Sequence, residues 1–112
     1  MAKGGKVLLI TGSPGSRTII NTVLGIVINV IDYEMPIDQA VAAPRMHHAW
    51  FPDEIRLERK DDFPELVNEL MRRGHRVVGG RQGDAHSIWI NPKTGGYVGA
   101  ADQRLSGKAA GY

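Results

Sequence analysis

KVLLITGSPGSRTII, residues 6–20, passes from one apolar run through a turn rich in glycine and serine into a second apolar run. The leucine and β-branched side chains over 6–11 predict a buried strand. Pro14 and Gly15 predict a tight turn, because proline fixes its own φ and glycine reaches conformations that other residues avoid. Ser16 suits an N-cap, which predicts a helix over 17–32. This stretch therefore predicts a strand joined to a helix by a short turn.

The predicted helix over 17–32 is apolar in nearly every direction around its axis. Its apolar side chains belong to Ile19, Ile20, Val23, Leu24, Ile26, Val27, Ile28, Val30 and Ile31. A helix of this kind must be buried on most sides. A chain of 112 residues has few places that surround a helix so completely, so we expect the isolated chain to dimerise or aggregate.

The other patterns predict a mostly antiparallel sheet packed with helices. Pro36 begins a helix over 36–43, and a second helix begins near Pro64 and ends at Gly74, with acidic residues early and arginines late. Strands are predicted over 54–58 and 76–78. A hairpin joins 87–91 to 97–101 through PKTGG. We expect one domain over 1–112, an α/β (α+β) sandwich.

Composition excludes several classes of function. The net charge of +2 is too small to indicate a nucleic-acid partner, and the absence of cysteine excludes disulfides and thiolate chemistry. The apolar run over 18–31 is interrupted by Asn21, Thr22, Gly25 and Asn29 and is shorter than the roughly 20 residues of a membrane span. The apolar stretch over 7–10 is shorter than the roughly 7–15 residues of a signal-peptide core.

The turn at 12–16 has three functional interpretations besides an ordinary connection. A glycine turn that enters a helix presents backbone N–H groups to an anion. The turn lacks the Lys-Ser or Lys-Thr pair of a P-loop and the three spaced glycines of a dinucleotide site. The remaining interpretation is an oxyanion hole, in which the N–H groups of Gly15 and Ser16 donate to a carbonyl oxygen that becomes negative during acyl transfer.

Four stretches resemble the C-terminal part of the small subunit of gamma-glutamyltranspeptidases. They are GSPGSRTIINTVLGIVINVIDYEMPIDQAVAAPRMHHAWFPDEIRLE (12–58), LMRRGHRV (70–77), GDAHSIWINPKTGGYVGAADQR (83–104) and AGY (110–112). The resemblance implies an N-terminal nucleophile hydrolase fold, a four-layer αββα sandwich made by a precursor that cleaves itself. It implies a γ-glutamyl small-molecule substrate such as glutathione, transferred to water, an amino acid or a peptide, and no cofactor.

The resemblance also implies roles for individual residues. Gly15 and Ser16 correspond to the oxyanion donors, with Ser16 in place of the commoner second glycine, and Ser13 and Pro14 are expected at the substrate. The nucleophilic threonine of the family lies upstream of the matching segment, and Thr11, Thr18 and Thr22 match non-catalytic positions. An internal threonine lacks the free α-amine that serves as base. We therefore expect the chain alone to be inactive, with a missing N-terminal portion, a large subunit or a second copy as its partner.

Family members are commonly exported, whereas a true start at Met1 would favour the cytoplasm.

Two arginines resemble family motifs, Arg45 in AAPRMHH and Arg104 in ADQR. We expect them to form buried structural ion pairs, with Asp102 as a partner for one of them. His47 and His48 are adjacent and point in different directions, and His75 and His86 are distant in sequence, so no metal site is predicted.

Two other functions stay open at this point. The chain could be a non-catalytic remnant that folds by self-association, or a small domain that binds an anion through the 12–16 turn.

Overall fold

The computed structural model describes residues 1–111, so Tyr112, the last residue of the AGY match, lies outside the described part. Its central element is an antiparallel sheet in the order β3–β7–β8. The strands are β3 (Leu9–Gly12), β7 (His86–Ile90) and β8 (Tyr97–Ala101). Leu9 lies opposite Trp89, and Ile88 lies opposite Gly99. The predicted hairpin through PKTGG is confirmed.

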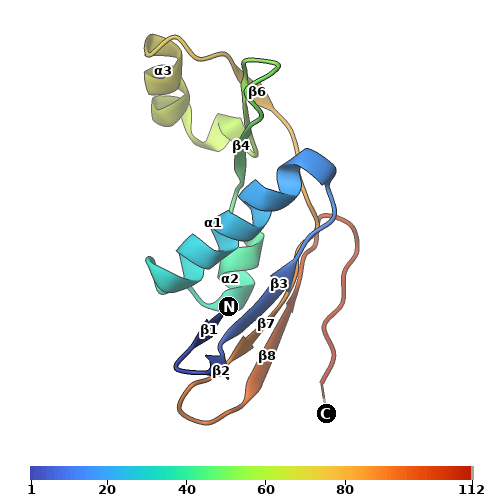
Figure 1. The fold of residues 1–112 in the computed structure, drawn as a ribbon. Helices are drawn as coiled ribbons and strands as arrows, with labels where there is room; N and C mark the ends of the chain where they lie inside the picture. Colours follow the sequence, from blue (N-terminus) through green and yellow to red (C-terminus); the bar gives the residue numbers. More distant parts are fainter. Residues whose placement is uncertain (112) are drawn as a thin grey trace.

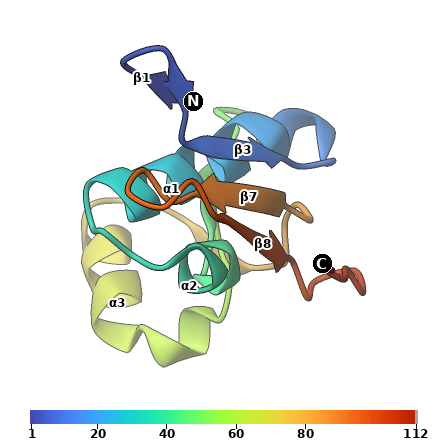
Figure 2. The same ribbon diagram turned by 90° about the horizontal axis from the view of Figure 1, so that it is seen from below.

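Two helices cover one face of this sheet (Figures 1 and 2). They are α1 (Ile19–Ile31) and α2 (Ile37–Ala42). The core between helices and sheet consists of Leu9, Ile26, Ile37, Val41, Ala85 and Ala100. This arrangement places the turn between β3 and α1 at one end of the sheet, next to the loop that enters β7.

The covering of α1 is one-sided. Only Thr22 and Ile26 of this helix are fully buried. Ile20 is 74% exposed and Leu24 is 53% exposed. The helix expected to be surrounded on most sides therefore has an apolar face that no described residue covers, the face of Ile20, Leu24 and Ile31.

A second small sheet, ordered β4–β5–β6, lies at the other end of the molecule (Figure 1). Its strands are β4 (Met46–His48), β5 (Ile55–Leu57) and β6 (Val77–Gly79). β4 and β5 are antiparallel, whereas β5 and β6 are parallel. A parallel pair needs a crossover connection, which here carries the helix α3 (Pro64–Arg72) and a preceding 3-10 turn at Lys60–Asp62.

Two element predictions need correction. The strand predicted over 6–11 is divided into β2 (Lys6–Val7), which pairs with β1 (Ala2–Lys3), and β3. The division falls at Leu8, whose N–H donates to the carbonyl of Met1 at 3.1 Å. β4 lies in a segment for which the sequence pattern predicts no element.

The layers agree with the predicted α+β sandwich, with helices on one face of a mainly antiparallel sheet. Among the described residues, no helix is both long and apolar enough to cross a bilayer.

Candidate functional site

The turn Ser13–Ser16, called the SPGS loop from here on, joins β3 to the start of α1. Gly15 has a φ of 133° and Ser16 a φ of 51°, so both residues have positive φ. Ser16 is the first residue of a 3-10 turn, Ser16–Thr18, and Thr18 occupies the N-cap position of α1. The prediction that Ser16 caps the helix is therefore wrong, because Thr18 holds the N-cap position and the backbone of Ser16 is left-handed.

Hydrogen bonds on both sides hold the SPGS loop. The carbonyl of Gly15 accepts from the backbone N–H and the hydroxyl of Thr18, each at 3.0 Å. The hydroxyl of Ser13 accepts from the N–H of Asp84 at 3.0 Å and donates to the carbonyl of Pro14 at 2.7 Å. Ser13 and Pro14 thus lie in the same rigid turn as the two predicted donors.

The backbone N–H groups of Gly15 and Ser16 are available for a ligand. Among the hydrogen bonds of the described residues, none is donated by either group. Both residues are exposed. Two consecutive N–H groups without a protein acceptor, next to the first turn of a helix, form an arrangement that accepts a negative oxygen.

A cavity of about 260 Å³ lies beside the loop and includes Gly15, Ser16, Arg17, His47 and Arg56 in its lining. His47 is 9% exposed, and its Nδ1 has no hydrogen-bond partner among the described residues. Burial, followed by the positive charges of Arg17 and Arg56, lowers the pKa of His47 below its ordinary value. The lowered pKa favours the neutral imidazole. Glu54 also lines the cavity, with its Oε1 3.6 Å from Arg56 Nη2, so the cavity carries charges of both signs.

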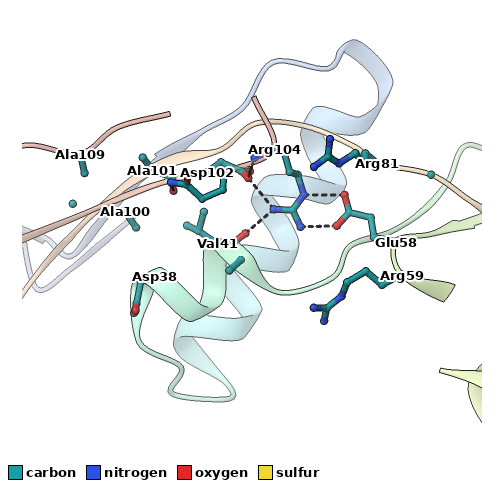
Figure 3. A pocket seen from close by; sticks show the side chains of 14 residues that line it. Asp38, Val41, Glu58, Arg59, Arg81, Ala100, Ala101, Asp102, Arg104 and Ala109 are labelled. Carbon is teal, nitrogen blue, oxygen red and sulfur yellow. Dashed lines mark hydrogen bonds and ion pairs between the residues drawn. The ribbon is translucent and has the colours of Figure 1, made fainter. Parts of the chain in front are cut away.

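The predicted structural residues Arg45, Asp102 and Arg104 gather with Glu58 in one buried group, called the charge cluster. Figure 3 shows Glu58, Asp102 and Arg104 of this cluster. Arg45 Nη2 lies 2.7 Å from Asp102 Oδ2, and Arg104 Nη1 lies 2.9 Å from Asp102 Oδ1. Arg104 also makes two hydrogen bonds to the carboxylate of Glu58. Asp102 thus bridges both arginines, and Arg104 bridges both carboxylates.

Backbone groups complete the charge cluster. The carbonyl of Val41 accepts from both arginines at 3.0 Å, and Arg104 also donates to the carbonyl of Ala43 at 2.9 Å. Since α2 ends at Ala42, the guanidinium groups satisfy carbonyls that the end of a helix leaves without partners.

The partners of the two carboxylates determine their ionisation. Burial raises the pKa of Glu58, but hydrogen bonds from Arg104, Gln82 and Arg45 outweigh it and hold this pKa below its ordinary value. Burial also opposes ionisation of Asp102, and the N–H of Ala85 together with the arginines lowers its pKa overall. The ionised form of both carboxylates is therefore favoured by their partners.

Glu58 is the member of the charge cluster that sequence reasoning missed. The alternation in EIRLE (54–58) predicts a half-exposed strand, yet Glu58 is only 5% exposed. The nearest signal was the pair of family-like arginines, which need acidic partners if they are buried. Because Glu58 lies 46 residues from Arg104 in the sequence, no local pattern links the two.

The histidines do not converge on one point. His48 Nε2 lies 3.1 Å from Asp53 Oδ1, and His86 Nε2 lies 3.2 Å from Asp84 Oδ2. Within residues 1–111 no group of three or more His, Cys, Asp or Glu side chains is arranged to hold a metal ion.

Comparison with known proteins assigns the chain to a family. The family model described as Gamma-glutamyltranspeptidase matches residues 1–112. The glutathione hydrolase proenzyme of Escherichia coli (strain K12) is 42% identical over 114 residues, covering 100% of this chain and 19% of the relative. The Acylase ACY 1 proenzyme of Pseudomonas sp. (strain SE83) is 35% identical over 108 residues, covering 94% of this chain and 18% of the relative.

A solved structure agrees with these sequence relatives. A mutant gamma-glutamyltranspeptidase from Helicobacter pylori superposes with a TM-score of 0.85 at 43% identity, over 93% of this chain and 57% of that chain. The predicted α+β fold of the N-terminal nucleophile hydrolases is thereby confirmed. The chain spans about a fifth of the length of the curated relatives it matches. The complete match of the family model, together with these identities, establishes that this chain belongs to the gamma-glutamyltranspeptidase family.

Proposed function

We propose that this chain is part of an enzyme that cleaves γ-glutamyl amides, and that its SPGS loop stabilises the oxyanion. The observation that carries the proposal is the pair of N–H groups on Gly15 and Ser16. They have no acceptor within residues 1–111, and the loop that carries them is held by Thr18 and Asp84. The E. coli relative is a glutathione hydrolase, which supports glutathione and similar γ-glutamyl amides as the substrate class.

The proposed chemistry is acyl transfer in two steps. A threonine hydroxyl attacks the γ-carbonyl carbon of the substrate, and the carbonyl oxygen becomes negative as the tetrahedral intermediate forms. The N–H groups of Gly15 and Ser16 donate to this oxygen, which lowers the barrier more than any contact with the neutral amide does. The amine leaves with a proton, and water or an acceptor amine then releases the glutamyl group from the threonine ester.

We propose that the nucleophilic threonine belongs to a part of the full-length enzyme other than this segment. Thr11, Thr18 and Thr22 lie within the chain and have no free α-amine to act as base. Thr18 and Thr22 are moreover committed to structure: Thr18 donates to the carbonyl of Gly15, and Thr22 is 1% exposed. A polypeptide of these 112 residues alone is therefore expected to be inactive.

The test compares two polypeptides on a γ-glutamyl anilide. The full-length protein that carries this segment should release the aniline, whereas the 112-residue polypeptide should show no turnover above a heat-treated control. Turnover by the purified short polypeptide would contradict the assignment of the nucleophile. An inactive full-length protein would contradict the proposed reaction.

A substitution in the SPGS loop then tests the oxyanion role. A Cβ at Gly15 would overlap the hydroxyl of Thr18, and the φ of 133° disfavours any side chain. Alanine keeps the backbone N–H but displaces it, so in the full-length enzyme Gly15→Ala should lower kcat by about 100-fold or more, the effect of losing an oxyanion donor. Gly12→Ala is the matched control, because a Cβ there meets nothing within 4 Å, and it should keep nearly full kcat.

The runner-up function is a non-catalytic protein that self-associates. The observation in its favour is the uncovered apolar face of α1, which a second copy could bury as well as the remainder of an enzyme could. The anilide assay separates the two, because a self-associating remnant has no turnover at any length.

A further inference from the structure

We propose that the segment Gln82–Ala85, called the supporting segment, fixes the position of the SPGS loop and that Gly83 is its essential positioning residue. The inference rests on the proposed oxyanion role of the loop. Residues 13–16 and 82–85 are far apart in the sequence, and the contacts between them account for two features that the fold alone does not require: a glycine at 83 and a serine at 13.

Gly83 allows the two segments to approach closely. A Cβ at this position would lie 2.7 Å from Ser13 Oγ and 2.7 Å from Thr22 Oγ1, which is closer than real side chains pack. Gly83 also has a φ of 67°, in the region that glycine adopts most easily. The neighbouring Asp84 donates its N–H to Ser13 Oγ at 3.0 Å. The supporting segment thus contacts the loop through a steric fit and through one hydrogen bond.

The supporting segment is itself held at both ends by the charge cluster. The N–H of Gln82 donates to Glu58 Oε1 at 2.9 Å, and the carbonyl of Gln82 accepts from Arg45 Nη1 at 2.9 Å. The N–H of Ala85 donates to Asp102 Oδ2 at 2.8 Å. Bonds to ionised groups are stronger than neutral ones, so the segment is a stiff support rather than a loose neighbour.

Stiffness matters for this chemistry because oxyanion donors act over a narrow range of distance. A donor must lie about 2.7–3.1 Å from the developing oxyanion, and a displacement of about 0.5 Å removes much of its effect. A side chain at Gly83 can be accommodated only if Ser13 or Thr22 moves. A displaced Ser13 hydroxyl would lose or distort its hydrogen bonds to the carbonyl of Pro14 and from the N–H of Asp84, which hold the SPGS loop.

The test uses Gly83→Ala and Gly95→Ala in the full-length protein. Gly95 has a φ of 74°, and a Cβ added there would meet nothing within 4 Å, so its substitution imposes the same backbone strain without the steric conflict. Amide hydrogen exchange should accelerate in Gly83→Ala at Asp84, whose N–H donates to Ser13 Oγ, and at Thr18, whose N–H donates to the carbonyl of Gly15. It should stay unchanged at both residues in Gly95→Ala. Unchanged exchange in Gly83→Ala overturns the proposal, whatever the activity of the protein.

A second measurement tests whether Gly83 positions the SPGS loop for binding the oxyanion. A γ-glutamyl boronate mimics the tetrahedral intermediate, whereas glutamate mimics the product ground state. Gly83→Ala should weaken boronate binding by about 10- to 100-fold and glutamate binding by at most about twofold. An equal loss for both ligands overturns the positioning role. Wild-type protein that binds neither ligand contradicts the proposed function instead, and the exchange result still decides whether the two segments are coupled.

A double-mutant cycle keeps the proposal testable if Gly83→Ala lowers the yield of folded protein. Ser13→Ala removes the hydroxyl that a Cβ at position 83 would meet, so the two substitutions should be less harmful together than their separate effects predict. Strict additivity of the two effects on boronate affinity overturns the direct contact.

Discussion

The backbone N–H of Ser16 is a proposed oxyanion donor, yet the residue has an unfavourable backbone conformation. Its φ of 51° is left-handed, which costs an L-residue roughly 1–2 kcal/mol. The proposed oxyanion donor is its N–H, so the side chain has no part in the proposed chemistry. A glycine at this position would relieve the strain and keep the donor, at the cost of greater freedom in the unfolded chain.

Ser16→Gly should therefore stabilise the full-length protein by a net of about 0.5–1 kcal/mol and leave kcat within about twofold. Denaturant unfolding measures the first effect and the anilide assay the second. Ser16→Ala is the control, since it removes the hydroxyl and retains the left-handed strain. If Ser16→Ala stabilises as much as Ser16→Gly, the hydroxyl rather than φ is responsible.

Glu58 makes stability depend on pH. Its pKa in the folded protein lies below the ordinary value of 4.5. A carboxyl with a depressed pKa contributes stability that is complete above the unfolded pKa and is lost as pH falls through the folded pKa. The pKa of Asp102 is lowered too, from an ordinary value of 3.8, so both carboxylates act in the same direction.

Unfolding midpoints in urea should therefore fall between about pH 6 and about pH 3. Glu58→Gln should destabilise by about 3–5 kcal/mol at the higher pH, because it breaks a buried pair, and should make the remaining dependence on pH shallower. Glu69→Gln is the control, since Glu69 binds Arg72 and Arg73 on the exposed surface of α3. If Glu69→Gln reduces the pH dependence of the unfolding midpoint as much as Glu58→Gln does, the charge cluster is not the source of that dependence.

At the scale of elements, the two faces of α1 differ in how much they contribute to stability. Ile26 is 1% exposed in the core against β3, whereas Ile20 is 74% exposed. Ile26→Ala should cost about 2–5 kcal/mol of unfolding free energy in any form of the protein.

Ile20→Ala distinguishes a naturally exposed face from one that other parts of the enzyme cover. In the 112-residue polypeptide, at dilutions that keep it monomeric, it should change the free energy of unfolding by less than about 0.5 kcal/mol. In the full-length protein it should cost about 2 kcal/mol or more. Equal and small costs in both forms would show that this face of α1 stays in solvent.

Elements with strong local signals were predictable, and those defined by distant partners were not. Pro64 and Gly74 bracket α3 because both act within one turn of the helix ends. β4 is a strand because Met46–His48 pairs with Ile55–Leu57. The three residues of β4 carry no sequence pattern that predicts this pairing.

The candidate site likewise has one part that the sequence predicts and one part that it does not. The SPGS loop is visible in the sequence because its turn residues are contiguous. Its support is not visible in this way, because α1, α2 and the second sheet separate Gly83 from Ser13 in the sequence. The positive φ of Ser16 was missed because serine normally favours the N-cap conformation that was predicted there.

At the scale of the whole molecule, apolar surface is exposed on two sides. One is the outer face of α1, with Ile20 and Leu24. The other is the face of the β3–β7–β8 sheet that carries Ile10, at 52% exposure, and Tyr97, at 75%. Contiguous apolar patches of this kind mark surfaces that associate.

The 112-residue polypeptide should therefore self-associate at micromolar concentration, with a weight-average mass in sedimentation that rises with concentration. Replacing Ile20 and Leu24 by glutamate should lower this mass toward that of a monomer. Asn68→Glu on α3, which adds charge away from both surfaces, should not. A well-behaved monomer at these concentrations would refute the expectation.

The charge cluster also constrains how this sequence can change over generations. Arg45, Glu58, Asp102 and Arg104 share their hydrogen bonds, so the loss of any one leaves an uncompensated charge in the interior. Each single replacement is therefore expected to be harmful. A joint replacement by apolar side chains would remove the unpaired charge, but it would leave the carbonyl of Gln82 and the N–H of Ala85 without their partners. Relatives should therefore keep all four residues, and lineages that retain only part of the set should be rare.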